Sequence, residues 1–335
     1  MVSKPTLVLV TPALAAANNG NWQTAQRWAG FLGHDYRLRL VEAWAGDEAQ
    51  AAPALMIALH ARRSAASIAA WRATYPKRPL VLVLTGTDLY RDIATDAAAQ
   101  ASLESADRLV VLNELGLDAL PAAMRSKGRV LLQSVPARQP PSATHKAKPT
   151  RWLRALMVGH LREEKSPQTY FEAARLLTHR RDIRLDHIGG GLDPGLAADA
   201  LALMQTAPQY RWLGALPHGS TRRRIQAAHV LVHASRMEGG AHVVIEAVVS
   251  GTPVLASRIA GNLGLLGAGY SGVFDWGDAA ALAVLLERCR DDPAMLPTLQ
   301  AQCDQRAPLF DPAHERHALL ALLQELLPTP TRGPP

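Results

Sequence analysis

The sequence predicts an α/β protein with two Rossmann-like, doubly wound parallel-sheet domains that face an interdomain cleft. The chain has 335 residues, enough for two α/β domains with a sizeable core each. Short apolar runs alternate with helical patterns in both halves, which is typical of βαβ units and a parallel sheet. Between the halves lies a segment rich in proline and lysine, Pro136 to Arg151, whose composition indicates a linker.

The first half is expected to form a domain over residues 1–140, followed by a linker at 141–151. Its strands are expected at TLVLV, YRLRLV, ALMIAL, PLVLVL, RLVVL and RVLLQ. Helices should separate these strands, at Trp22–Leu32, Arg63–Thr74 and Thr95–Ser105.

The second half, residues 152–305, repeats the alternation. Its strands are expected at WLRALMVG, IRLDHIGG, YRWLG, HVLVHAS and TPVLAS, and a helix is expected at Ala279–Cys289. A C-terminal helix within residues 306–328 should pack back toward the first domain. A proline-rich tail follows at 329–335.

The composition is that of a globular protein, with 48% hydrophobic and 19% charged residues. The net charge of +7 suggests anionic ligands, although charge alone does not separate nucleic acid from phosphorylated metabolites. The densest basic cluster, Arg222–Arg224, is interpreted as the solvated face of a helix, and His218 and His233 as structural histidines. Cys289 and Cys303 match no metal or redox spacing, so both are expected to be buried thiols in a reducing cytoplasm.

The most informative segment runs from Glu238 to Glu246, with the sequence EGGAHVVIE. Gly239 and Gly240 follow the first glutamate and would leave backbone N–H groups open at a helix N-terminus, where a diphosphate can bind. Glu246 falls about two turns into that helix, within reach of the two hydroxyls of a ribose. The alternative is an N-capped core helix with one glutamate whose hydrogen bonds are satisfied.

Two further loops of the second half add candidate ligand groups. The segment VGHLREEKSP places His160, Arg162 and Lys165 after the first strand, where their cationic donors would lie over a diphosphate. In HIGGGLDP, Gly190 is expected to shape a base pocket, and the incomplete G-x-G-x-x-G pattern supports NAD only weakly. The alternative for VGHLREEKSP is an ordinary loop with surface charges, and the alternative for HIGGGLDP is a plain turn from a strand to a helix.

The order of these motifs across residues 153–275 resembles the C-terminal domain of the GT-B nucleotide-sugar glycosyltransferases. The resemblance implies a UDP-sugar donor whose diphosphate is bound by Lys165 and whose ribose is bound by Glu246. It also implies that Glu238 lies beside the transferred sugar and acts in catalysis. A backbone cradle is implied at Gly239, Gly240 and Ala241.

This sequence departs from the family at one position of the diphosphate loop. The usual arginine after the loop glycine is His160 here, so either Arg162 supplies the missing charge or the diphosphate is bound less tightly. No D-x-D pair is present, and fixed positive charge can replace a metal. Neither a metal nor a cofactor is therefore expected.

Three loops after strands of the first half should converge on the cleft and bind the acceptor. Adjacent arginines beside hydroxyl and backbone donors suit a phosphate group, because a guanidinium can bind two phosphate oxygens at once. The candidate acceptor residues are Gly20, Asn21, Arg62, Arg63, Thr85, Gly86, Thr87 and Arg91. His60 and Asp88 are candidates to orient a water molecule for the loss of a phosphoryl group. The alternative is that Arg62 and Arg63 only cap and solvate the following helix.

The strings IALHARRS, LTGTDLYRD, GNWQTAQRW and VLLQSVP closely resemble the selenosugar synthases of selenoneine biosynthesis, which belong to the GT-B glycosyltransferases. This resemblance implies transfer of N-acetylglucosamine or glucose from a UDP-sugar to selenophosphate, with formation of a carbon–selenium bond. It implies small-molecule substrates, no nucleic acid and no membrane, and leaves the oligomeric state open. No apolar run approaches the ~18 residues that a membrane-spanning helix needs.

Three other functions fit parts of the pattern. The nearest is a glycosyltransferase that acts on an ordinary hydroxyl or thiol and would need a base beside the acceptor. An NAD-linked oxidoreductase would share the two Rossmann-like domains, but the dinucleotide pattern is incomplete. A nucleic-acid-binding module fits the basic charge, but the sequence contains no recognised binding motif.

Overall fold

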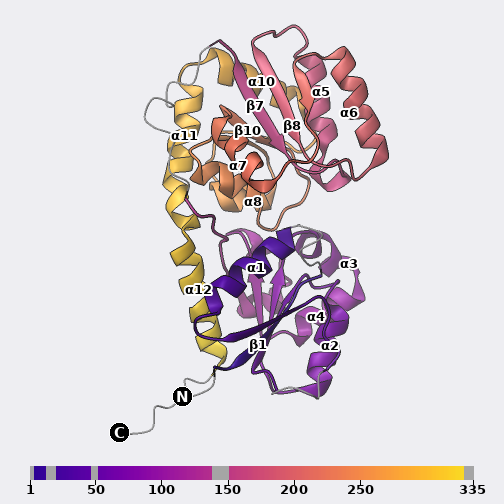
Figure 1. The fold of residues 1–335 in the computed structure, drawn as a ribbon, viewed down its shortest axis with the longest axis vertical. Coiled ribbons are helices and arrows are strands. Elements are labelled where there is room, and N and C mark those ends of the chain that lie inside the picture. Colours follow the sequence, from indigo (N-terminus) through magenta and orange to yellow (C-terminus); the bar gives the residue numbers. More distant parts are fainter. Residues whose placement is uncertain (1–3, 13–19, 47–51, 138–150, 328–335) are drawn as a thin grey trace. The chain divides into compact units, whose positions relative to one another are not determined.

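The computed structural model describes residues 4–12, 20–46, 52–137 and 151–327. Contacts divide the chain into two compact units, which Figure 1 shows as ribbons. Unit 1 comprises Met1–Ser134 and Pro312–Pro335, and unit 2 comprises Val135–Asp311. Each unit is built around one parallel sheet with helices on it, as the alternating sequence pattern predicts.

The sheet of unit 1 contains six parallel strands in the order β2-β1-β3-β4-β5-β6. Their bounds are β1 Thr6–Val10, β2 Arg37–Val41, β3 Leu55–Leu59, β4 Leu80–Leu84, β5 Arg108–Val111 and β6 Gly128–Val130. The runs LMIAL and LVLVL are buried along their whole length, because helices cover both faces of the sheet. The strand order reverses between β1 and β3, and doubly wound sheets bind ligands at such a point.

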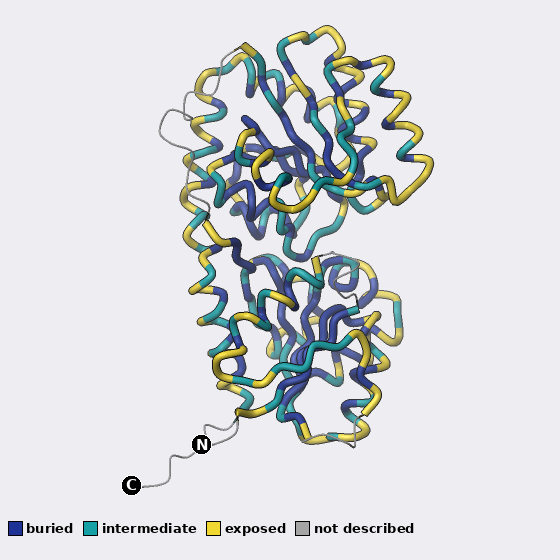
Figure 2. Tube along the Cα trace, viewed as in Figure 1, coloured by how far each residue is buried: buried dark blue, intermediate teal, exposed yellow. Residues whose placement is uncertain are grey.

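Two pairs of helices cover the faces of this sheet (Figure 1). Helices α1 (Gly20–Leu32) and α12 (Pro312–Leu326) pack on the face that includes Leu7 and Leu9. Helices α2 (Ala65–Thr74) and α4 (Ala97–Ser105) pack on the opposite face. Shorter helical segments are η2 Asp88–Asp92, α3 Ile93–Thr95, η3 Gly116–Ala119 and η4 Ala122–Lys127. Figure 2 shows buried strands enclosed by helices whose outer sides are exposed.

A buried carboxylate, Glu315, fastens α12 to the rest of unit 1. It is 2% exposed and accepts hydrogen bonds from Arg27 Nε (2.7 Å), Arg27 Nη2 (2.9 Å) and Trp28 Nε1 (2.7 Å). The backbone N–H and the hydroxyl of Ser134 also donate to it, at 2.7 and 2.5 Å. The strings GNWQTAQRW and VLLQSVP therefore both contribute to holding α12, which is a structural reason for their composition.

Replacing Glu315 by alanine should lower the free energy of unfolding by about 3–5 kcal/mol, because the largely buried Arg27 would lose its carboxylate. Urea denaturation followed by circular dichroism checks this. The control is Glu325→Ala, since Glu325 is 40% exposed in its pairs with Arg108 and Arg129. Loss of the Glu325 side chain should lower the free energy of unfolding by at most about 1 kcal/mol. Equal effects of the two substitutions would contradict the role assigned to Glu315.

The sheet of unit 2 contains six parallel strands in the order β12-β11-β10-β7-β8-β9. Their bounds are β7 Leu153–Val158, β8 Ile183–Ile188, β9 Tyr210–Trp212, β10 Val230–His233, β11 Val254–Ser257 and β12 Val273–Phe274. The order reverses between β7 and β10, which is the ligand-binding point of a dinucleotide-binding sheet. The sequence pattern misses β12, because two residues carry no periodicity.

The helices of unit 2 are α5 Pro167–Leu176, α6 Pro194–Thr206, α7 His218–Ala227, α8 His242–Val249, α9 Ala260–Leu266, α10 Ala279–Asp291 and α11 Met295–Arg306. They lie between these strands along the chain, except α10 and α11, which follow β12. A 3-10 turn at Ala307–Phe310 separates α11 from α12, so the long C-terminal helix begins only at Pro312. Proline suits this position because the first helical residue needs no N–H donor.

Cys289 in α10 and Cys303 in α11 are buried and form no disulfide. Burial raises the pKa of Cys289 to about 12 and that of Cys303 to about 11, so both thiols are protonated at neutral pH. Within the described ranges, no three His, Cys, Asp or Glu side chains are grouped so that they could hold a metal ion. In the same ranges no helix has the length and apolar character needed to cross a membrane.

Candidate active site

The candidate donor site of unit 2 lies where β7 and β10 end, on either side of the reversal in strand order. The loop after β7 carries Lys165, and the loop after β10 carries Glu238. Two glycines allow close backbone packing beneath these loops. A Cβ atom at Gly261 would lie 1.9 Å from the carbonyl oxygen of Glu238, and one at Gly189 would lie 1.8 Å from that of Gly159. Sequence reasoning missed Gly189 and Gly261, although both lie in the glycine-containing strings HIGGGLDP and SRIAGNLG.

Glu238 is the electrostatic centre of this site. Its Oε1 atom contacts Lys165 Nζ and lies 3.5 Å from His233 Nε2, which also lies 3.3 Å from Ser235 Oγ. Burial raises the pKa of Glu238, but the Lys165 charge and the His233 hydrogen bond outweigh burial and hold the pKa well below its usual range. Glu238 is therefore an anion at neutral pH. It can stabilise positive charge on a neighbouring carbon, but it has no proton to donate.

Glu246 lies in helix α8, and two histidines and one arginine surround its carboxylate. Its Oε1 lies 2.6 Å from His218 Nε2, 3.8 Å from His242 Nδ1 and 3.9 Å from Arg222 Nη1. Burial raises the pKa of Glu246, but the hydrogen bonds of both histidines and the Arg222 charge lower it to about 2. Glu246 is thus an ionised acceptor, as binding of ribose hydroxyls requires.

The interpretation of Arg222–Arg224 as a solvated face is wrong at its first position. Arg222 is 5% exposed, whereas Arg223 and Arg224 are exposed. Ile225 is also buried, so Arg222 and Ile225 lie on the inner side of α7 at a spacing of three residues. His218 precedes Arg222 by four residues, and this spacing is the sequence signal that could have placed both beside one carboxylate.

Substitution of Glu246 by glutamine should make the free energy of unfolding less dependent on pH in the acid range. The folded pKa of about 2 lies below the ordinary value of 4.5, so ionised Glu246 contributes stability above pH 4.5 that is lost as the pH falls toward 2. We expect the variant to be less stable by about 3 kcal/mol at neutral pH and to approach the wild type near pH 2. Urea unfolding at a series of pH values checks this, and a difference that does not change with pH would contradict it.

The loop after β7 does not place three cations as the sequence predicts. His160 Nδ1 accepts a hydrogen bond from the backbone N–H of Gly190 at 3.0 Å. Burial lowers the pKa of His160, and the charges of Arg162 and Lys165 lower it further. His160 is therefore neutral and offers an Nε2–H donor, while Arg162 is half exposed with its Nε 3.9 Å from Glu164. The cationic role assigned to His160 is wrong, and Gly190 acts here by orienting that ring.

Helix α8 begins at the predicted place but without an ordinary N-cap. The N-cap residue is Ala241, whose side chain makes no capping hydrogen bond. The alternative of an N-capped core helix is therefore wrong in this respect. Gly239, Gly240 and Ala241 lead directly into an eight-residue helix, an arrangement that suits an anion at the helix N-terminus.

The candidate acceptor site of unit 1 consists of the loops after β3 and β4. Asp88 is fully buried and accepts hydrogen bonds from the backbone N–H groups of Ala61 (2.9 Å), Thr85 (2.8 Å) and Gly86 (2.9 Å). It therefore ties the two loops together. Because its carboxylate is committed to backbone donors, the contacts do not support the assignment of Asp88 to a water molecule.

His60 has a strained backbone and a neutral ring. Its φ of 74° lies in the left-handed region, which is unusual for a residue other than glycine and is often found at functional sites. Its Nε2 lies 3.2 Å from Thr87 Oγ1. Burial lowers the pKa of His60 in spite of the nearby Asp88 carboxylate. A neutral imidazole at this place can accept a proton, so His60 stays a candidate base.

Two predicted arginines meet on one carboxylate that the sequence analysis did not single out. Arg62 Nε donates to Asp92 Oδ2 at 3.0 Å, and Arg91 Nε donates to Asp92 Oδ1 at 2.9 Å. Arg63 is exposed, and its backbone N–H lies 3.4 Å from His60 Nδ1. Gly20 and Asn21 begin α1, and the segment before them lies outside the described residues. The structure thus gathers the residues of LHARRS and LTGTDLYRD into one group.

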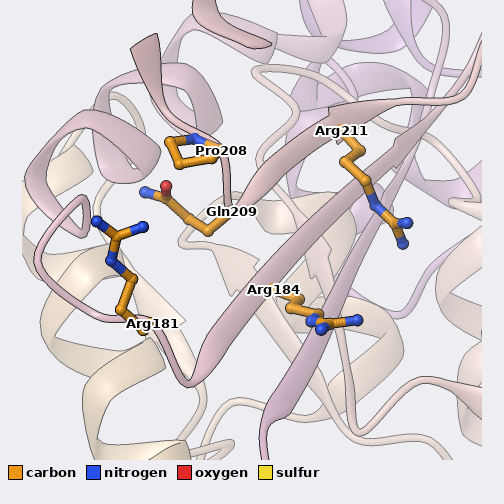
Figure 3. A pocket seen from close by; sticks show the side chains of 5 residues that line it. All are labelled: Arg181, Arg184, Pro208, Gln209 and Arg211. Atoms are coloured by element: carbon orange, nitrogen blue, oxygen red, sulfur yellow. The ribbon is translucent and has the colours of Figure 1, made fainter. Parts of the chain in front are cut away.

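A separate pocket of about 330 Å³ lies on unit 2 where β8 and β9 begin (Figure 3). It is lined by Arg181, Arg184, Pro208, Gln209 and Arg211. Arg211 pairs with Asp186, and Arg184 stacks on Trp152 with 3.9 Å between the guanidinium carbon and the ring centroid. Doubly wound sheets bind their main ligands at the carboxyl ends of strands, so this pocket is distinct from the candidate site.

Comparison with known proteins gives a family match and several structural neighbours. Residues 143–309 match the family model described as "Glycosyl transferases group 1". The D-inositol 3-phosphate glycosyltransferase 1 of Catenulispora acidiphila is 32% identical over 184 residues, which cover 51% of this chain and 44% of that protein. The D-inositol 3-phosphate glycosyltransferase of Arthrobacter sp. is 32% identical over 165 residues, covering 48% and 39%. The chain thus spans less than half the length of each of these relatives.

The structural neighbours share the fold at low sequence identity. A sucrose-phosphate synthase from Thermosynechococcus elongatus has a TM-score of 0.76 and 18% identity, covering 97% of this chain and 99% of that one. Anabaena HepE in complex with UDP and glucose has a TM-score of 0.74 and 14% identity, covering 97% and 100%. These similarities show a GT-B-like fold.

Proposed function

We propose that the protein, whose residues 143–309 match the model of the group 1 glycosyltransferases, is a glycosyltransferase that transfers a sugar from a UDP-sugar to selenophosphate. The transferred sugar is N-acetylglucosamine or glucose, and the product is a selenosugar for selenoneine biosynthesis. The observation that carries the donor half of this proposal is the contact between Lys165 and Glu238 at the reversal in strand order of unit 2.

The donor is proposed to bind along the loops after β7 and β10. Glu246 accepts hydrogen bonds from the ribose, and the diphosphate lies near Lys165, Arg162 and the N-terminus of α8. Neutral His160 adds an N–H donor to the diphosphate. These groups stabilise UDP as the leaving group, while the Glu238 anion faces the positive charge that develops on the anomeric carbon.

The acceptor is proposed to bind to the loops after β3 and β4. The resemblance of the LHARRS and LTGTDLYRD strings to selenosugar synthases supports this, as do the paired arginines beside Thr85 and Thr87. A selenium anion is a strong nucleophile, so the main task of these residues is positioning. Transfer requires the anion bound by unit 1 to meet the anomeric carbon bound by unit 2, and this meeting is part of the proposal.

The proposed reaction has two steps. A selenium lone pair forms the C–Se bond while the bond from the anomeric carbon to the UDP oxygen breaks and its electron pair leaves with UDP. Water then attacks phosphorus, the P–Se bond breaks, and phosphate and a selenol are released. His60 is the candidate base for this water, because its ring is neutral and lies beside the acceptor loops.

A second candidate acceptor is a phosphorylated alcohol. Both curated relatives are named as D-inositol 3-phosphate glycosyltransferases, so the acceptor in their names carries a phosphate group. The paired arginines of unit 1 suit such a phosphate as well as they suit selenophosphate. In this case a hydroxyl oxygen would attack the anomeric carbon, and His60 would take its proton.

The test is to incubate the purified protein with UDP-N-acetylglucosamine or UDP-glucose under reducing conditions, with selenophosphate, with D-inositol 3-phosphate, or with neither. UDP release and the selenium isotope pattern of the product are followed together by mass spectrometry. We expect UDP release that depends on selenophosphate and a selenium-containing sugar. UDP release with inositol phosphate alone would favour the second acceptor. The absence of any UDP-sugar turnover or binding would overturn the proposed function.

A further inference from the structure

Asp92 joins the two acceptor loops in a way that neither sequence motif indicates. It ends the π-helical turn η2 and is 4% exposed. Its two oxygens are divided between two arginines, with Oδ2 accepting from Arg62 Nε and Oδ1 from Arg91 Nε. Arg62 follows β3, whereas Arg91 follows β4. One buried carboxylate therefore brings together two guanidinium groups from different parts of the chain.

We propose that Asp92 is a positioning residue that holds Arg62 and Arg91 as a clamp for the phosphate group of the acceptor. The inference rests on the proposed function, because it takes the loops after β3 and β4 as the acceptor site. Asp92 acts through the arginines and does not touch the substrate. Its role is to set the distance and orientation of the two cations before the anion arrives.

The geometry leaves the arginines suited to bind an anion. Asp92 accepts a hydrogen bond from the Nε atom of Arg62 and from the Nε atom of Arg91, so it holds each guanidinium through one atom. The side chains of Arg62 and Arg91 are 45% and 47% exposed, whereas that of Asp92 is 6% exposed. The pair is thus anchored at a buried point and accessible on its outer side.

The charge of Asp92 keeps two like charges close to each other. Two guanidinium cations at short distance repel, and a carboxylate between them offsets that repulsion when no ligand is bound. Burial raises the pKa of Asp92, but its hydrogen bond from Arg91 and the charges of both arginines bring the pKa below its ordinary value. Asp92 therefore remains ionised across the neutral pH range and can hold both arginines throughout that range.

The surrounding backbone indicates more than an incidental surface ion pair. The π-helical turn Asp88–Asp92 and the left-handed His60 are both rare and unfavourable local conformations, and both occur within these two loops. Asp88 stabilises them by accepting three backbone N–H groups from the same loops. The loops that place Arg62, Arg91 and Asp92 next to each other thus contain two strained backbone conformations, which is typical of a functional site.

The test compares Asp92→Asn with the wild type and with Asp96→Ala. Asparagine keeps the size of Asp92 but can accept through only one side-chain atom, so one arginine is released. Asp96 is the matched control, because it caps α4 by accepting from Ala99 N–H and contacts neither arginine. Thermal unfolding of both variants reports any general loss of structure.

Two readouts are measured on the full chain. The first is the KM for the acceptor and for the UDP-sugar, and the second is the affinity for thiophosphate, titrated by calorimetry with UDP present to fill the donor site. We expect Asp92→Asn to raise the acceptor KM and the thiophosphate Kd by about tenfold and to leave the UDP-sugar KM within about twofold. Asp96→Ala should lower the unfolding temperature without changing either acceptor constant.

The outcomes separate this inference from the function on which it rests. If the wild type binds thiophosphate and turns over the acceptor but Asp92→Asn matches it in both constants, the clamp is wrong and the proposed function stands. If the wild type neither binds thiophosphate nor turns over an anionic acceptor, the proposed acceptor site and the clamp both fail. If Asp92→Asn does not fold, Arg62→Lys replaces it, since lysine keeps the charge but lacks the Nε donor and should raise both constants similarly.

Discussion

Replacing Lys165 by alanine should lower kcat/KM for the UDP-sugar by about 10²–10³-fold, because a fixed charge that stabilises the leaving diphosphate is lost. The substitution also removes the main cause of the low pKa of Glu238. The pKa of Glu238 should therefore rise, and the residual activity of the variant should fall at acid pH where the wild type remains active. Initial rates of UDP release at a series of pH values measure both effects.

The matched control for Lys165 is Arg175→Ala. Arg175 lies on α5 of the same unit, is 46% exposed and pairs with the exposed Glu172, so its loss removes one positive charge away from the site. We expect a change in kcat/KM of less than about twofold for this variant. If Lys165→Ala is as active as Arg175→Ala, the donor site is not built around Lys165 and Glu238.

Replacing Arg62 by alanine should raise the KM for the anionic acceptor by about 10–100-fold, which corresponds to the loss of hydrogen bonds to a charged group. The KM for the UDP-sugar should not change, because Arg62 belongs to unit 1 and the donor loops belong to unit 2. Steady-state kinetics with each substrate varied in turn separate the two constants.

Lys77→Ala is the control for Arg62. Lys77 is exposed in the turn between α2 and β4, at the amino end of that strand, whereas the acceptor loops follow the carboxyl ends of β3 and β4. A similar increase in acceptor KM for both variants would mean that only the general positive charge of the protein attracts the acceptor. If the acceptor KM does not increase for Arg62→Ala, Arg62 does not bind the acceptor. The alternative that Arg62 only caps and solvates the following helix would then hold.

Much of the donor site follows from local sequence. EGGAHVVIE predicts the start of α8, the position of Glu246 on it and the placement of Glu238 before it, because turn and helix geometry depend on neighbouring residues. What the sequence does not predict is the partner of each carboxylate. Glu246 contacts His218 and Arg222 of α7, and Glu238 contacts Lys165 from a loop about seventy residues earlier in the chain.

The acceptor loops show the same limit more sharply. LTGTDLYRD contains two aspartates four residues apart, and nothing in the string distinguishes them. The fold assigns Asp88 to three backbone amides and Asp92 to two arginines, because the π-helical turn directs them to different neighbours. The prediction that Asp88 orients water is unsupported for this reason, and the sequence carries no signal for the role of Asp92.

The sequence by itself determined the α/β class, the positions of eleven of the strands and the loops in which the candidate residues lie. Burial of apolar runs drives these features, and that information is local and periodic. The tertiary structure alone decided which charges meet, which histidines are neutral and which arginine is buried. Those outcomes depend on distances between side chains far apart in the chain and on the loss of water around them, and no local pattern encodes either quantity.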